Sequence, residues 1–227
     1  MKAKIKPSTV DQTPLTLEFL ERNPRVKGKR VFALVLFGDT TRFRRWRSRP
    51  FLSSEKHARF MIALYDTFIR FRNGSGYFVK LLADGLMAVV ELPQDKKAAA
   101  VIEMLVHADK LVRSIQSVIR HLNYPRPDGF RIRVAAGDVL KLEASHPLDK
   151  SKIQVDYSEY AVDIAFGLLG VEKELSQLCH ETVREIVRSD SKARAKIKFE
   201  KVKRPAVCPE GIDPEDLDAL WSYRILK

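Results

Sequence analysis

The stretch Val35-Leu-Phe-Gly-Asp-Thr-Thr-Arg-Phe-Arg44 determines how the rest of the chain is interpreted. It completes a run of β-branched and apolar residues from about Arg30 to Phe37, and such a run predicts a buried strand. The strand ends on Gly38-Asp39, and hydroxyl and basic side chains follow at once. A carboxylate in this position, beside backbone amides and arginines, can hold a divalent cation over phosphate groups. The alternative is that Asp39 only caps the next helix.

A second stretch, Tyr77 to Glu91, contains two apolar runs that meet at Ala83-Asp84-Gly85. Asp-Gly between such runs indicates a β-hairpin, so Asp84 is expected on a tight turn. If the first strand neighbours this hairpin, Asp39 and Asp84 face each other at one edge of the sheet. Two carboxylates there repel each other unless a cation lies between them, and Mg²⁺ or Mn²⁺ with a phosphate would fit. The alternative is a pair of solvated turn residues.

Bulk composition describes an ordinary globular protein. The chain has 227 residues, of which 45% are hydrophobic and 31% charged. No apolar run approaches the roughly 18 residues that a membrane span needs, and the basic N-terminus lacks the apolar segment of a secretory signal. The two cysteines, Cys179 and Cys208, have neither metal-ligand nor CxxC spacing. We therefore expect a cytoplasmic protein without a membrane partner.

The formal net charge of +12 favours anionic partners, and nucleic acid is the first candidate. Much of the excess lies in the N-terminal tail, in Arg42 to Arg49 and in Lys192 to Arg204. The middle cluster directly follows Asp39, and a nucleoside triphosphate would account for it as well as a polynucleotide would. On this basis we do not expect a nucleic-acid partner.

Hydrophobic periodicity predicts one α+β domain over residues 29–227, preceded by an arm over residues 1–28. The predicted order is strand, helix, strand, strand, helix, strand, which is the ferredoxin-like βαββαβ arrangement with both helices on one face of an antiparallel sheet. A C-terminal extension of helices and strands follows it. The predicted elements are a strand at 30–37, a helix from Ser53 to about Asn73, the hairpin at 77–91, a helix capped by Asp95 and reaching Leu122, a strand at 130–136 that stops at Gly137-Asp138, helices at 161–175 and 178–188, an edge strand within 189–204 and a last strand within 217–226.

Four motifs in this order resemble those of the class III nucleotidyl cyclase catalytic domain. Phe37-Gly-Asp-Thr-Thr-Arg-Phe43 resembles the strand end "F-x-D-x-x-x-F", and Val79 to Ala88 resembles the second motif, with a Lys four residues before the metal Asp. Arg131 to Val139 resembles "R-V-G-I-x-x-G-x-V", and Val155 to Ala165 resembles "Y-D-x-x-G-x-x-V-N-x-A". The resemblance covers about residues 29–227.

The resemblance implies conversion of a nucleoside triphosphate to a 3′,5′-cyclic nucleotide and pyrophosphate with two Mn²⁺ or Mg²⁺ ions per site. Asp39 and Asp84 would bind both metals, with the Thr40 carbonyl as a further ligand. Asp163 would act at the ribose as a third catalytic residue. The implied nucleotide-binding residues are Phe37, Thr41, Arg42, Phe43, Arg44, Lys80 and Asp156.

The family also implies a homodimer with its sites at the interface. Lys80 and Asp156 of one subunit would then contact the base held against Asp39 and Asp84 of the other. This Lys–Asp pair resembles the pair of adenine-selecting members.

Two departures from the family pattern point elsewhere. The family carries Asn where this chain has Asp163, and an Arg that stabilises transition-state charge where it has Gly167. Arg42 and Arg133 are the candidates to replace that Arg. These departures resemble the bacterial pyrimidine cyclases of Pycsar anti-phage systems, so we favour a uridylate cyclase that makes cyclic UMP. The alternatives are an adenylate cyclase, an inactive cyclase-fold module that only binds nucleotide or a partner, and a palm-type polymerase or nucleic-acid-binding protein.

Overall fold

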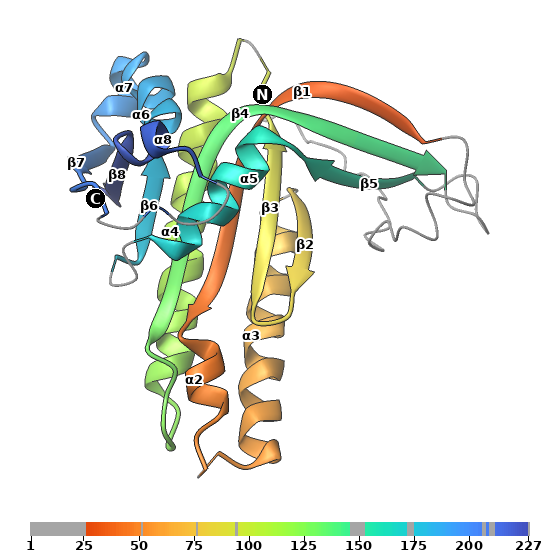
Figure 1. Ribbon diagram of the computed structural model, residues 1–227, viewed down its shortest axis with the longest axis vertical. Helices are drawn as coiled ribbons and strands as arrows, with labels where there is room; N and C mark the ends of the chain where they lie inside the picture. Colours follow the sequence, from red (N-terminus) through yellow and green to blue (C-terminus); the bar gives the residue numbers. More distant parts are fainter. Residues whose placement is uncertain are drawn as a thin grey trace.

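The centre of the structure is an antiparallel pair of long strands, β1 (Lys27–Thr41) and β4 (Gly129–Ser145), shown in Figure 1. The structure is a computed structural model, and it describes residues 26–50, 52–75, 77–93, 95–145, 153–171, 175–205, 208 and 212–226. Almost all of the predicted arm, residues 1–28, therefore lies outside the described residues.

The hairpin of β2 (Phe78–Leu82) and β3 (Gly85–Glu91) lies on the other side of β1 from β4. The strand order β2-β3-β1-β4 is that of the ferredoxin-like sheet, so the predicted α+β core is confirmed. Asp39 pairs with Gly85 in the register between β1 and β3, which brings the end of β1 beside the hairpin turn.

Helices α3 (Ser54–Ser75) and α4 (Lys97–Arg120) cover one face of this sheet (Figure 1). Side chains alternate along β1, so Leu34 and Leu36 point into this layer and are fully buried. Helix α3 contributes Phe60, Leu64 and Phe68 at helical spacing, all with no exposed surface. Fully burying such side chains stabilises a fold by about 1.5–3 kcal/mol each, so this layer is the main core.

The opposite face of the sheet carries α5 (Tyr160–Gly167) and the short helix η1 (Leu168–Gly170). Ala33, Val35 and Phe37 of β1 point to this side and are buried in a second, smaller cluster. By the same alternation Asp39 belongs to this face. Strand β5 (Ile153–Ser158) pairs with the far part of β4 and leads into α5.

The C-terminal extension widens the sheet beyond β4. Strand β6 (Gln177–His180) pairs with β4 in parallel, β8 (Leu220–Ile225) pairs with β6, and β7 (Ile197–Lys201) forms the edge. The remaining helices of this part are α6 (Glu181–Arg188), α7 (Ser191–Arg194) and α8 (Pro214–Leu217). The predicted last strand and the predicted edge strand are thereby confirmed.

Four details of the predicted elements were wrong. The helix predicted at 161–175 ends at Gly167, where the short helix η1 follows. The fourth strand does not stop at Gly137-Asp138, because the chain continues extended and Gly137 instead leaves room for the Tyr160 ring, 3.0 Å from where a Cβ would lie. The predicted helix at 178–188 begins only at Glu181, because Leu178 and Cys179 form a buried strand. Asp95 does not cap α4, whose N-cap is Lys96 without a side-chain hydrogen bond.

The cap at the start of α3 is as predicted, since the Ser53 hydroxyl accepts a hydrogen bond from the Lys56 amide at 3.3 Å. Within the described residues, no helix is both long enough and apolar enough to cross a bilayer.

We predict that Gly85→Ala destabilises the protein by about 1–3 kcal/mol, because the new Cβ would lie 2.2 Å from the Gly38 carbonyl oxygen and the backbone must move. Thermal unfolding measures the effect. Gly74→Ala is the matched control: its Cβ meets nothing within 4 Å, so its melting temperature should be unchanged or slightly higher. Equal melting temperatures for the two variants would show that the close strand contact at Gly85 is not a constraint.

Candidate active site

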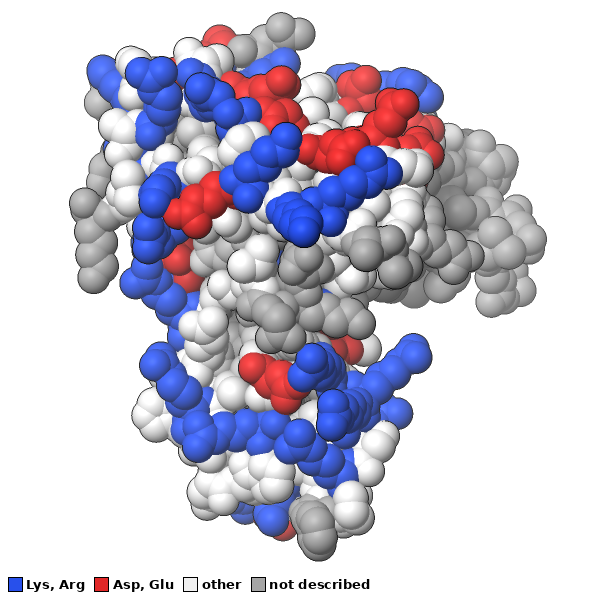
Figure 2. Space-filling model, turned by 60° about the vertical axis from the view of Figure 1, so that its left-hand side comes forward, with Lys and Arg blue, Asp and Glu red and all other residues white. Residues whose placement is uncertain are grey.

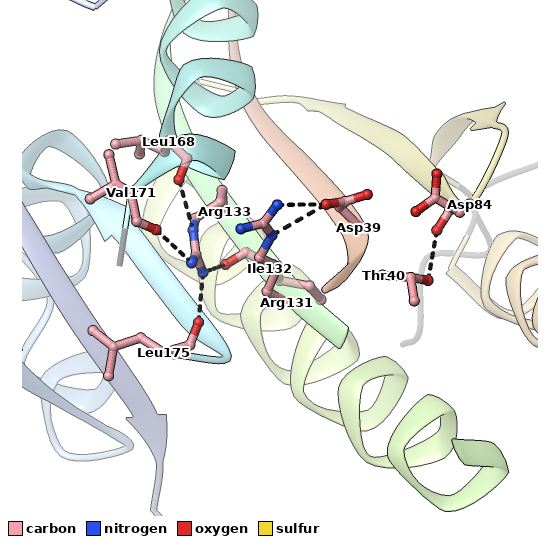
Figure 3. Close-up of polar contacts among 9 residues, drawn as sticks. All are labelled: Asp39, Thr40, Asp84, Arg131, Ile132, Arg133, Leu168, Val171 and Leu175. Atoms are coloured by element: carbon pink, nitrogen blue, oxygen red, sulfur yellow. Dashed lines mark hydrogen bonds and ion pairs between the residues drawn. The ribbon is translucent and has the colours of Figure 1, made fainter. Parts of the chain in front are cut away.

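The predicted acidic pair is brought together at the end of β1 (Figure 3). The Asp84 carbonyl accepts hydrogen bonds from the Thr40 amide at 3.3 Å and from the Thr40 hydroxyl at 2.9 Å. Thr40 has only 1% of its surface exposed, so its side chain is committed to this contact. The hairpin turn is therefore tied to the residue that follows Asp39.

The two carboxylates are close enough to influence each other's ionisation. Burial, and then the charge of Asp39 and a hydrogen bond to it, raise the pKa of Asp84 to about 7. The nearby Arg131 acts in the opposite direction with a smaller effect. Burial and the charge of Asp39 thus outweigh the effect of Arg131 and favour the protonated form of Asp84.

Arg131 is a site residue that the sequence showed only as part of a motif. It lies on β4 directly opposite Asp39 and donates two hydrogen bonds to one Asp39 oxygen, from Nη2 at 2.7 Å and from Nε at 3.2 Å. Arg131 is 9% exposed, and its Nη1 is buried without a hydrogen-bond partner in the described part of the chain. The register between β1 and β4, once known, would have identified it.

The donor set fits divalent cations that are shared with a substrate. Within the described residues no cluster of three or more His, Cys, Asp or Glu could hold a metal by itself. Two carboxylates suit Mg²⁺ or Mn²⁺, which commonly take one or two protein carboxylates and complete their coordination with phosphate oxygens and water. The raised pKa of Asp84 is what such a pair shows when no cation separates the charges.

A short arginine-rich helix, α2 (Phe43–Arg47), begins where β1 ends. Its N-cap, Arg42, adopts a left-handed conformation with φ 56° and provides no side-chain cap for the helix amides. Lysine and arginine side chains gather around this end of the molecule, the lower end in Figure 2. Backbone amides and positive charge are thus next to the carboxylates, as the predicted contact of Thr41 to Arg44 with a triphosphate requires.

Several predicted nucleotide ligands have their side chains engaged elsewhere. Phe43 is 9% exposed and packs on Trp46, His57 and Phe60 in the main core. Phe37 is 5% exposed and its ring meets that of Phe166 at 5.4 Å.

Arg42 pairs with Asp128 at 2.9 Å, whereas Arg44 is exposed. Packing occupies the rings of Phe37 and Phe43, so a nucleotide contact of either residue would involve its backbone, and their assignment as nucleotide-binding residues stays a prediction.

Lys80 and Asp156 form an ion pair at 2.6 Å, with 25% and 15% of their side chains exposed. The pair joins β2 to β5, and β3 separates β2 from the strand that carries Asp39. Two strand spacings correspond to about 10 Å, so within one chain the pair is separate from the acidic pair. Asp163 is exposed on α5, three residues before Phe166, which contacts β1.

The structure gives a physical reason for Gly167. A Cβ at this position would lie 2.4 Å from Cγ1 of the buried Ile212, so a larger side chain at position 167 would require Ile212 to move.

Arg133 cannot replace that arginine, because it is fully buried and its guanidinium donates to the carbonyls of Ile132, Leu168, Val171 and Leu175 at 2.9–3.0 Å (Figure 3). The suggestion that Arg133 serves in catalysis was wrong, and its role is to hold Leu168, Val171 and Leu175 against β4.

A cavity of about 770 Å³ lies between α3 and α4, and none of its lining residues belongs to this site. A polar cavity of about 110 Å³ lies beside the end of β1 and is lined in part by Thr41, Arg42 and Arg131. The smaller cavity is the one adjacent to the acidic pair.

No family model matches the chain, and no curated protein matches its sequence. The mixed α+β fold is nevertheless that of the class III nucleotidyl cyclase catalytic domain, as solved structures show. The adenylyl cyclase CyaB from P. aeruginosa matches with a TM-score of 0.64 over 88% of this chain and 96% of that chain, at 14% identity. The guanylyl cyclase Cya2 matches with a TM-score of 0.61 over 87% and 93%, at 12% identity.

A bacterial light-regulated adenylyl cyclase matches with a TM-score of 0.63 at 15% identity, over 88% of this chain and 54% of that one, so the chain spans about half of that protein. At identities this low, the structural likeness establishes that the proteins share a fold.

We predict that the metal-free protein loses stability as pH rises from about 4 to about 7. The folded state then retains the Asp84 proton, with a pKa raised from 3.8 to about 7, after the unfolded state has lost it. Asp84→Asn removes this loss, so in chelator at pH 8 the variant should melt about 2–4 °C above the parent, as about 1 kcal/mol after solvent screening implies. At pH 4 the two should coincide. A parent protein whose stability is flat over this range would contradict the close pairing.

Proposed function

We propose that the protein is a nucleotide cyclase that converts a nucleoside triphosphate to a 3′,5′-cyclic nucleotide and pyrophosphate. The convergence of Asp39 and Asp84 at the end of β1 is the observation that carries this proposal. In the reaction the 3′-oxygen forms a bond to the α-phosphorus, the bond from the α-phosphorus to the bridging oxygen breaks, and the hydroxyl proton passes to water. Pyrophosphate leaves with the bridging oxygen and the electron pair of the broken bond.

Asp39 and Asp84 would hold two Mn²⁺ or Mg²⁺ ions, with the Thr40 carbonyl as a third protein ligand. Bound metal ions lower the pKa of a coordinated hydroxyl and neutralise the charge that develops on the phosphates. Asp39 positions Arg131 through two hydrogen bonds, and Arg131 lines the polar cavity beside the end of β1, where its guanidinium would stabilise a bound phosphate. The amides of Thr41 to Arg44 and the Arg44 side chain would contact the remaining phosphates.

Arg131 is also the best candidate for the cation that Gly167 does not supply. It lies beside the carboxylates, whereas Arg133 is buried among carbonyls and Arg42 pairs with Asp128. A guanidinium fixed in advance can stabilise transition-state charge without reorganising.

We further propose a homodimer with two equivalent composite sites. Lys80 and Asp156 are already paired within one chain and lie two strands from Asp39, so they suit a base held by the partner subunit. Asp163 of the same subunit would then act at the ribose.

UTP is the substrate that we favour, because the chain departs from the purine cyclases at Asp163 and Gly167. Ile212 packs against Gly167 and leaves no room for a side chain at that position, so the packing of the fold requires the second departure. A role as second-messenger synthase in anti-phage defence follows from the same resemblance to pyrimidine cyclases. ATP is the second candidate, and the Lys80–Asp156 pair favours it, since a donor beside an acceptor can contact the amino group and ring nitrogen of adenine.

Incubation with ATP, GTP, CTP and UTP separately in Mn²⁺ tests the reaction. We expect a cyclic nucleotide and an equal amount of pyrophosphate from one pyrimidine triphosphate above the others. Asp39→Ala and Asp84→Ala should each lower turnover by at least about 10³-fold, because the metals lose a shared ligand. Thermal unfolding that stays cooperative in both variants is the control for folding. Cyclase turnover within tenfold of the parent in either variant would refute the site.

Mixing two inactive variants tests the composite site. Asp39→Ala removes the metal half of a site and Asp156→Ala removes the base half, so a mixed dimer retains one site with both halves intact. Random exchange of subunits should therefore restore about a quarter of the parent activity per dimer. Mixed dimers that form, as shown by two affinity tags, but stay inactive would place all the residues in one subunit.

A further inference from the structure

We propose that the end of the molecule around α2 binds the phosphate backbone of duplex nucleic acid. The surface consists of Arg45, Arg47, Arg49 and Arg126, here called the arginine end. It excludes Arg42 and Arg44, which the proposed function assigns to a triphosphate.

The arginine end is built on an anchored helix. Two apolar residues of α2, Phe43 and Trp46, are buried, with 9% and 1% of their surface exposed. The Trp46 ring nitrogen donates to the Pro125 carbonyl at 2.6 Å, which fixes α2 against the loop that carries Arg126. With these two side chains turned inward, the arginines of α2 are left on the solvent side.

The four guanidinium groups of the arginine end form no ion pair within the part of the chain that the structure describes. Elsewhere on the surface basic side chains do pair with acids one turn away, as in Arg59–Glu55, Arg70–Asp66 and Arg113–Asp109. Unpaired like charges held close together on a short segment are mildly destabilising. Their positive potential is therefore available to an external anion (Figure 2).

A nucleoside triphosphate does not account for the whole cluster. Helix α2 runs from the end of β1 away from the sheet (Figure 1), at about 1.5 Å per residue. A triphosphate bound at Asp39 reaches the start of α2, where Arg42 and Arg44 lie. Arg47 is at the last position of α2, and Arg49 follows the helix, so both lie further from Asp39 along the chain. This distribution revises the expectation that a triphosphate explains the arginines as well as a polynucleotide would.

The buried aromatics decide which kind of nucleic acid fits. Single strands are bound largely by stacking of bases on exposed aromatic rings, and here Phe43 and Trp46 are both inside the core. The arginine end offers charge and bidentate donors without a stacking surface, which suits phosphates along a duplex. Binding should then be independent of sequence and strongly dependent on salt.

Fluorescence anisotropy with the full chain and a labelled duplex of about 20 base pairs, as DNA and as RNA, tests the proposal. If about four phosphates are neutralised, the dissociation constant should rise about 10²-fold between about 50 and 200 mM salt. Arg45→Glu, Arg47→Glu and Arg49→Glu together should weaken binding at least about tenfold, and Arg126→Glu alone should weaken it by a smaller factor. Cyclase turnover should not change in these variants.

The matched control carries the same charge reversal on the other basic surface, at Lys192, Arg194 and Lys196, which are all exposed. It should bind duplex within about twofold of the parent. Any of three results would overturn the proposal: no duplex binding at low salt, equal loss in the control, or tighter binding of a single strand with the same number of phosphates. Equal binding of polyglutamate or of phosphatidylserine vesicles would likewise reject nucleic acid as the partner.

Discussion

Two hydrogen bonds from Thr40 to the Asp84 carbonyl hold two acidic residues, distant in sequence, at one end of a sheet. Burial of Asp84, and then the charge of the neighbouring Asp39, raise the pKa of Asp84 to about 7, so a divalent cation would stabilise the pair of carboxylates. Two neighbouring residues help to keep the end of β1 beside the hairpin turn. Gly85 lets β3 approach the Gly38 carbonyl, and Arg131 meets Asp39 from the opposite strand. A site that is destabilised without its ligand is the expected arrangement for catalysis, because binding energy then relieves the repulsion.

The fold also explains why position 167 of α5 carries a glycine. Ile212 packs where a side chain would start, and Arg133 anchors η1 with four carbonyl contacts. Positive charge lies instead at the end of β1, on Arg131 and on Arg44. The two halves of the proposed site, the acidic pair and the Lys80–Asp156 pair, lie on different strands of one chain. A dimer would bring one half of each subunit together.

Sequence patterns predicted the ferredoxin-like core and the meeting of Asp39 with Asp84, because hairpin turn chemistry and apolar periodicity are local signals. They did not predict Arg131 as the partner of Asp39, because that contact depends on the register between β1 and β4. They also did not predict that the rings of Phe37 and Phe43, which stand beside the site in sequence, pack into the two cores. The strand at Leu178 was missed because a short strand buried on both faces has no alternating pattern.

Mn²⁺ binding in the presence of a nucleoside triphosphate that lacks the 3′-hydroxyl tests the central claim most directly, since it separates assembly of the metal site from turnover. Electron paramagnetic resonance should show two ions per site with the magnetic coupling of neighbouring ions, and the coupled signal should vanish in Asp84→Ala. Binding of two coupled ions that is unchanged in Asp84→Ala would contradict the account, as would a protein that binds the triphosphate but no Mn²⁺ beyond the amount the triphosphate itself carries.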